Sequence, residues 1–114
     1  MKAVVKERTG VGQVALIDRK VPEIEHDEVL IKTKFSTIGA EVRVYKDDPA
    51  FRSVVHPPVI LGTENCGEIV DIGRNVKHWK IGDRVVSEIY VGSCGHCVYC
   101  KTRNLGRCLE VETL

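Results

Sequence analysis

Residues 57–86 read PPVILGTENCGEIVDIGRNVKHWKIGDRVV, and this stretch decides the fold class. The two prolines at its start preclude a helix there and favour an extended backbone before Val59. Gly67 and Gly73 enclose a run in which β-forming residues predominate. A polar turn then leads into a second β-rich run at residues 84–89. The stretch therefore predicts short strands joined by polar turns.

The residues before this stretch continue the same pattern. Residues 3–5 and 13–17 flank a glycine-containing turn, which predicts an opening hairpin. Residues 28–34 form the next predicted strand, in which Val29, Ile31 and Thr33 share one face. Residues 40–45 offer a single turn of helix. Short strands in close succession with little helix indicate a mainly β fold, a small closed or partly closed β-barrel.

Length and charge limit the classes of function. The 114 residues predict one domain over 1–114, and the formal net charge of +1 gives no reason to expect nucleic acid or a membrane surface as a partner. No apolar run approaches the roughly 20 residues that span a bilayer, and no signal-peptide pattern opens the chain. We therefore expect a cytoplasmic protein.

Four of the five cysteines, Cys94, Cys97, Cys100 and Cys108, follow the spacing C-x2-C-x2-C-x7-C. In a cytoplasmic chain such a cluster indicates metal ligands rather than disulfides. Four thiolates complete the tetrahedral shell of zinc and leave no open position, which is typical of a structural site. We expect a zinc lobe over about residues 92–108 that protrudes from the barrel, with one ion per chain.

Two other interpretations of the cluster were weighed. The bacterial ferredoxin pattern also begins C-x2-C-x2-C, but its next cysteine comes three residues later and is followed by proline. Four free or disulfide-bonded thiols are the non-metal alternative. His96 lies inside the loop, and we expect it to face solvent because four sulfur atoms already fill the shell.

The segment from Pro57 to Val85, together with the cysteine lobe, resembles the zinc-containing medium-chain dehydrogenase/reductase family, which includes sorbitol, threonine and butanediol dehydrogenases. The family signature G-H-E-x2-G-x5-G is present from Gly62 to Gly73 except that Thr63 replaces the histidine. The resemblance implies a GroES-like barrel as catalytic domain, followed in full-length relatives by a Rossmann domain that binds NAD or NADP. No G-x-G-x-x-G occurs in the sequence, so we expect the chain to be truncated before that domain.

The resemblance also places a second, catalytic zinc ion in such domains. Its cysteine ligand corresponds to Ile38, the proton-relaying hydroxyl to Ala40 and its histidine ligand to Thr63, whereas Glu64 matches the family glutamate near this ion. Ile38 has no metal-binding atom and Thr63 offers only a neutral hydroxyl, so no intact catalytic residue is expected.

Other residues near these positions allow alternatives. Cys66, Glu41 and His56 are the alternative ligands for a rebuilt second metal site. Otherwise we expect Cys66 to be a small buried residue and Glu41 to be a surface or structural carboxylate. His26, His56 and His78 are expected at the surface. We expect Trp79 to pack at the barrel edge.

These patterns lead to two hypotheses of function. The first is a catalytic-domain fragment of a zinc-dependent alcohol or polyol dehydrogenase that is inactive alone, and the second is a zinc-stabilised binding or scaffold module without turnover. We also expect homo-oligomers through the face that a Rossmann domain covers in relatives, with contributions from residues 38–44 and 59–61.

Overall fold

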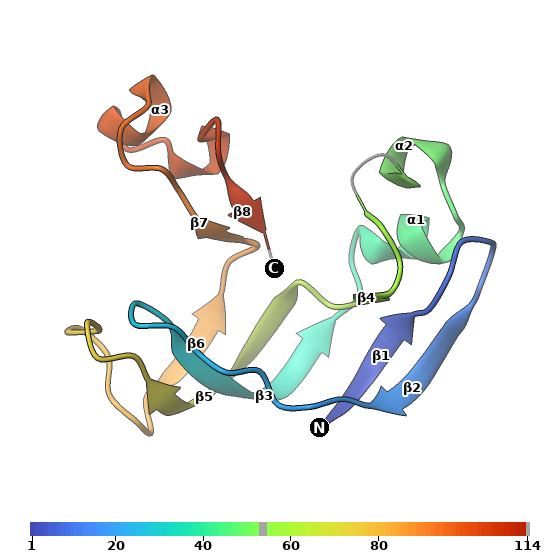
Figure 1. Ribbon diagram of the computed structural model, residues 1–114, viewed down its shortest axis with the longest axis horizontal. Helices are drawn as coiled ribbons and strands as arrows, with labels where there is room; N and C mark the ends of the chain where they lie inside the picture. The colour runs from blue at the N-terminus through green and yellow to red at the C-terminus, as the bar shows by residue number, and fades with distance from the viewer. Residues whose placement is uncertain (53–54, 114) are drawn as a thin grey trace.

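Two three-stranded sheets and a small separate lobe make up the computed structural model, which describes residues 1–52 and 55–113 (Figure 1). All strand pairs are antiparallel. The first sheet has the order β2 (Val14–Asp18), β1 (Lys2–Lys6) and β4 (Val59–Ile60). The second has the order β3 (Val29–Thr37), β5 (Glu64–Ile72) and β6 (Arg84–Ser87). The mainly β fold is confirmed.

The predicted opening hairpin is confirmed, with Val4 paired to Leu16 in the β1–β2 register. Its turn contains Gly10 and Gly12, whose φ angles of 106° and 74° favour glycine. Lys6 at the end of β1 is only 1% exposed, and its ammonium group donates hydrogen bonds to the carbonyl oxygens of Gly10 and Gly12. A buried cation is thereby satisfied by the turn that it helps to shape.

The strand predicted over residues 28–34 is present as part of β3. Its pairing with β5 has two register shifts, between Leu30 and Ile31 and between Thr33 and Phe35. The first shift places the extra residue, Val70, on β5, and the second places the extra residue, Lys34, on β3. The shifts therefore leave the alternation of Val29, Ile31 and Thr33 along β3 uninterrupted.

Among the described residues, the two larger sheets are not hydrogen-bonded into a closed barrel. β4 supplies one edge and has only two residues. The preceding residues, Pro57 and Pro58, carry no N–H donors, and Gly62 with φ 103° turns the chain soon afterwards. Of the closed or partly closed barrel that was predicted, the described residues thus form the strands in two open sheets, without closure.

The core is small for the length of the chain. Its buried apolar side chains outside the lobe are Ala3, Val5, Val44, Leu61 and Ile69. The accessible surface is 8612 Å², whereas a compact monomer of this mass exposes about 6,200 Å². Trp79, expected to pack at a barrel edge, is 52% exposed and lines a shallow open pocket with Asp27 and His78.

Two short helices follow β3. The predicted helical turn is confirmed as α1 (Glu41–Tyr45). A second helix, α2 (Pro49–Arg52), was not predicted. Asp48 organises its start, because its carboxylate accepts from the backbone N–H of Ala50 at 2.9 Å and from Arg43 at 2.8 Å. The Arg43 guanidinium also lies 4.5 Å from the centre of the Phe51 ring.

The lobe begins at β7 (Tyr90–Gly92), which follows β6 along the chain, and it ends at β8 (Glu112–Thr113), which pairs with β7 in a separate two-stranded sheet. Between them lie α3 (Val98–Lys101) and the 3-10 helix η1 (Leu105–Arg107). Figure 1 shows the lobe projecting from the sheets on the opposite side of the view from α1 and α2, as expected for a protruding lobe. None of the helices among the described residues has the length and apolar composition that a membrane span requires.

Candidate metal centre

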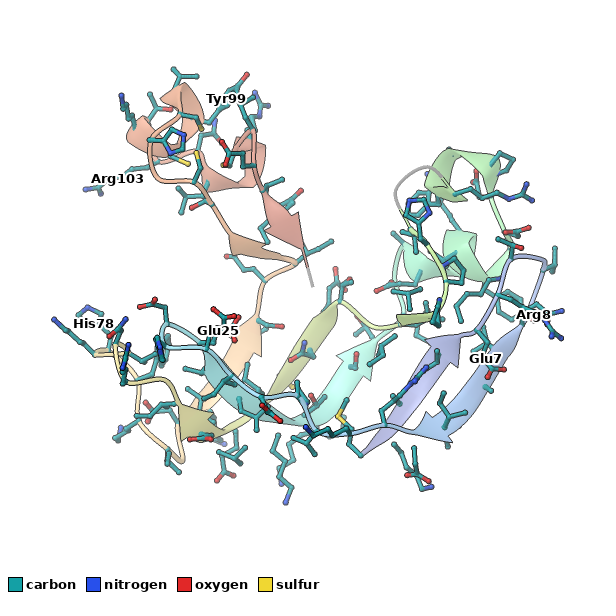
Figure 2. All side chains as sticks on the ribbon, viewed as in Figure 1. Glu7, Arg8, Glu25, His78, Tyr99 and Arg103 are labelled. Atoms are coloured by element: carbon teal, nitrogen blue, oxygen red, sulfur yellow. The ribbon has the colours of Figure 1, made fainter. Side chains whose placement is uncertain are left out.

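The four cysteines come together in the lobe because its turns alternate with short helices. Cys94 follows β7, Cys97 caps the start of α3, Cys100 lies within α3, and Cys108 follows η1. Gly95, at φ 74°, allows the tight turn between the first two cysteines. Figure 2 shows the sulfur atoms gathered inside the lobe near the labelled Arg103.

The sulfur atoms have the spacing that a single tetrahedral ion requires. All four lie within 4.8 Å of one another. Sγ of Cys100 is 3.9 Å from Sγ of Cys94 and 3.6 Å from Sγ of Cys97. Four sulfur atoms bound to zinc at about 2.3 Å lie about 3.8 Å apart. The cluster could therefore hold a metal ion, and both its geometry and its thiolate chemistry fit zinc.

Backbone N–H groups surround the sulfur atoms as hydrogen-bond donors. Sγ of Cys108 accepts from the N–H of Cys94 at 3.2 Å and of Glu110 at 3.3 Å, and Sγ of Cys94 accepts from the N–H of Cys97 at 3.4 Å. Such bonds stabilise negative charge on sulfur and orient each ligand. The peptide groups of the loop thus form part of the site.

These surroundings shift the thiol pKa values in the metal-free chain. Hydrogen bonds from the backbone N–H groups of Cys100 and Leu109 lower the pKa of Cys97 to about 6. The N–H of Cys94 lowers the pKa of Cys108. Burial raises the pKa of Cys100 to about 12, and its contact with the Cys97 sulfur acts in the same direction. These hydrogen bonds therefore favour the thiolate of Cys97, the form that binds metal.

His96 and Glu110 lie beside the tetrad. Nδ1 of His96 is 2.8 Å from the carbonyl oxygen of Cys94, and Nε2 is 3.6 Å from Oε1 of Glu110. Both side chains are largely exposed, as expected for His96. Their ligand atoms and Sγ of Cys94 all lie within 4.8 Å of one another. The contact of Glu110 with His96 was not predicted, because Glu110 lies outside the cysteine spacing pattern.

The positions that correspond to a catalytic zinc site form a hydrogen-bonded network around Glu41 instead. Oε1 of Glu41 accepts from the backbone N–H and from the hydroxyl of Thr63, each at 2.7 Å, and Oε2 accepts from the N–H of Gly39 at 2.8 Å. Glu41 is only 8% exposed. Its burial raises its pKa, but the bonds from Thr63 and Gly39 outweigh this effect, so the pKa lies below its usual value.

The other family positions contribute no metal ligand set. Ile38 is 59% exposed and Ala40 is also exposed. Oε2 of Glu64 accepts from the hydroxyl of Thr37 at 2.7 Å. A Cβ atom at Gly39 would lie 3.7 Å from Oε2 of both Glu41 and Glu64, so the two carboxylates approach the chain at the same point.

The alternatives for a rebuilt second metal site are not supported. In residues 1–52 and 55–113, no group of three metal-binding side chains includes Cys66, Glu41, Glu64 or His56. Cys66 is half-buried rather than buried. His26, His56 and His78 are exposed, which confirms their expected place at the surface.

Comparison with known protein families agrees with the fold and the cysteine lobe. The family model of the alcohol dehydrogenase GroES-like domain matches residues 25–114. The chain belongs to this family. This GroES-like domain is 40% identical over 109 residues to D-arabitol-phosphate dehydrogenase of Enterococcus avium, covering 95% of the chain and 30% of the relative. It is 38% identical over 109 residues to L-threonine 3-dehydrogenase of Shewanella sp. (strain ANA-3), and this match covers 95% of the chain and 31% of the relative.

Solved structures show the same relationship. An NAD-dependent alcohol dehydrogenase superposes on the GroES-like domain with a TM-score of 0.85 at 27% identity, covering 100% of the chain and 33% of that protein. A zinc-dependent alcohol dehydrogenase from Streptococcus pneumonia gives a TM-score of 0.79 at 26% identity, with coverages of 100% and 32%. The chain thus spans about a third of the length of these relatives. The predicted resemblance to zinc-containing alcohol dehydrogenases is confirmed.

Proposed function

We propose that this GroES-like domain is the zinc-lobe-bearing part of an alcohol or polyol dehydrogenase, in which Cys94, Cys97, Cys100 and Cys108 hold one structural zinc ion. The observation that carries the proposal is the spacing of the sulfur atoms, which lie within 4.8 Å of one another. A bound zinc ion cross-links the turns of the lobe, which have little apolar core of their own.

The names of the relatives support a proposal for the substrate class. D-arabitol phosphate and L-threonine, which give two of the relatives their names, are both hydroxyl-bearing compounds. We therefore assign the whole protein to hydride transfer from a small polar alcohol to NAD or NADP. The GroES-like domain would contribute to the substrate-binding site of such an enzyme. We assign no NAD- or NADP-binding site to the described residues.

The residues at the catalytic zinc position do not fit that ion. Ile38 has no donor atom, and the hydroxyl of Thr63 donates to Glu41. Both oxygens of Glu41 already accept hydrogen bonds from the chain. We derive no catalytic step through a zinc ion at this position, and we expect the chain by itself to produce no NADH from alcohols.

The second candidate function is a zinc-stabilised binding module without turnover. Exposed large apolar side chains, among them Phe35 at 76% and Val86 at 80% exposure, favour it because contiguous apolar surface is typical of interaction faces. Dinucleotide binding distinguishes the two candidates. The dehydrogenase needs NAD or NADP in the functional protein, whereas the module does not.

Zinc content tests the main proposal. We expect purified chain to hold one zinc ion in the tetrad, measured by elemental analysis after dialysis. Cys100→Ser should lose the ion, whereas the matched control Cys66→Ser should keep it, because Cys66 lies in β5 outside the tetrad. Equal zinc content in the two variants would show that the tetrad is not the site.

A further inference from the structure

The side chains of His96 and Glu110 face each other across the solvent side of the tetrad. Nε2 of His96 lies 3.6 Å from Oε1 of Glu110, and the two side chains are 72% and 68% exposed. Sγ of Cys94 completes a group of three ligand atoms within 4.8 Å of one another. This group combines imidazole, carboxylate and thiolate, which are the three ligand types that zinc accepts.

One nitrogen of the His96 ring is held by the backbone. Its Nδ1 lies 2.8 Å from the carbonyl oxygen of Cys94. A carbonyl oxygen only accepts hydrogen bonds, so Nδ1 carries the proton and donates it in this contact. Nε2 is the ring nitrogen on the side of Glu110, 3.6 Å from its Oε1, and in the neutral ring it offers a lone pair to a metal ion. Metal-binding histidines regularly have their second ring nitrogen held by a backbone carbonyl in this way.

The ligand spacing agrees with this assignment. Nitrogen and oxygen ligands bound to one tetrahedral zinc ion at about 2.0–2.1 Å lie about 3.4 Å apart. The 3.6 Å between Nε2 of His96 and Oε1 of Glu110 is close to that value. As a surface ion pair alone, the same contact would contribute little to stability. The spacing is therefore compatible with a shared ion.

We infer that His96, Glu110 and Cys94 form a second, exposed and weaker site for Zn²⁺, which shares the Cys94 thiolate with the tetrad and loads it. The inference rests on the proposed function, since it requires the tetrad to bind zinc. An ion at the second site is held by three protein ligands and water, so it has an open position for exchange. During loading it keeps its bond to Sγ of Cys94 while His96, Glu110 and water are replaced by the three other thiolates. The protons of any thiols among them pass to solvent.

Titration with Zn²⁺ alone tests the second site. The full chain, first loaded with one equivalent, is titrated calorimetrically, with native mass spectrometry to count ions. We expect a second, weaker equivalent in the wild-type chain. His96→Ala and Glu110→Gln should each weaken this equivalent at least about 10-fold and leave the first in place. The matched control His78→Ala, which alters an exposed histidine outside both cysteine groups, should bind both ions.

The rate of metal transfer provides a second readout that a merely structural contact would not change. A chelator in excess should remove the tetrad ion at least about 10-fold more slowly from His96→Ala than from wild type, with the same total zinc released. Wild-type affinity for the second ion in His96→Ala, or saturation of the wild type at one ion, would overturn the inference. Failure to bind a tight first ion would overturn the proposed function and the shared site with it.

Discussion

Glu41 and Thr63 are joined by two hydrogen bonds although 22 residues separate them, because Oε1 of Glu41 accepts from both the backbone N–H and the hydroxyl of Thr63. The same carboxylate accepts from the N–H of Gly39. One buried side chain thus connects the start of α1 to the loop between β4 and β5. The carboxylate holds together the two segments that the family resemblance associates with a catalytic metal.

The hydroxyl of Thr63 should contribute more to the stability of the fold than the volume of its side chain. Thr63→Val removes the donor and leaves the buried Glu41 oxygen with one hydrogen bond fewer, so we expect the free energy of unfolding to fall by about 1–2 kcal/mol. Thr63→Ser keeps the hydroxyl, so its free energy of unfolding should fall much less. Urea unfolding of the zinc-loaded chains measures both values, and equal losses in the two variants would contradict the role of the hydrogen bond.

Stability should depend on pH through Glu41. Its folded-state pKa is lowered relative to its usual value of 4.5, so the ionised carboxylate contributes stability that is fully present above pH 4.5. That contribution is lost as pH falls through the lower folded-state pKa. The difference in unfolding free energy between wild type and Glu41→Gln should be largest near pH 7 and should shrink below pH 4.5. A difference that stays constant from pH 7 to pH 3 would rule out ionisation as its source.

Zinc removal should unfold the lobe without unfolding the sheets. We expect the lobe to depend on its metal ligands, because the one buried side chain in its described part is the ligand Cys108, at 5% exposure. The sheets have their own buried residues, including Val5 in β1 and Ile69 in β5, which are both 0% exposed. After chelation, hydrogen exchange should speed up in residues 92–108 and remain slow in β1 and β5. Uniform loss of protection would show that the zinc ion stabilises the whole domain.

Self-association should use the exposed face of the second sheet. Phe35 in β3 and Val86 in β6 are 76% and 80% exposed. Both pair with Cys66 in β5, so the three residues form one row across the sheet. From the segments expected to contribute, Ile38 and Ile60 are exposed, whereas Val44 and Leu61 are buried and cannot take part. We expect a dimer by sedimentation velocity at high protein concentration.

A charged variant locates that interface. Phe35→Lys should shift the equilibrium toward monomer, because it places charge within the apolar row. The matched control is Val11→Lys, which alters a residue that is 68% exposed in the β1–β2 turn, and it should sediment like wild type. A wild-type chain that is monomeric throughout the concentration range would contradict the prediction.

Local features were predictable from the sequence, whereas features that depend on distant residues were not. The hairpin and the cysteine tetrad each depend on residue spacing within a short segment. Composition and glycine positions were therefore sufficient to predict them. The two hydrogen bonds between Glu41 and Thr63 required the register of β5 against β3, which contains two shifts. Likewise, the contact of His96 with Glu110 depends on the path of the chain after Cys108, and the short helix α2 depends on Asp48 and Arg43 together.

The pairing of β7 with β8 places Gly92 opposite Glu112, so the chain enters and leaves the lobe at adjacent residues. Everything between these residues forms a loop whose two ends are already adjacent. Such a segment behaves as a removable cassette, because a tight turn of a few residues could join its ends without displacing the rest of the chain. The metal-binding lobe could accordingly be transplanted onto another β-hairpin, or lost from this one, as a single unit.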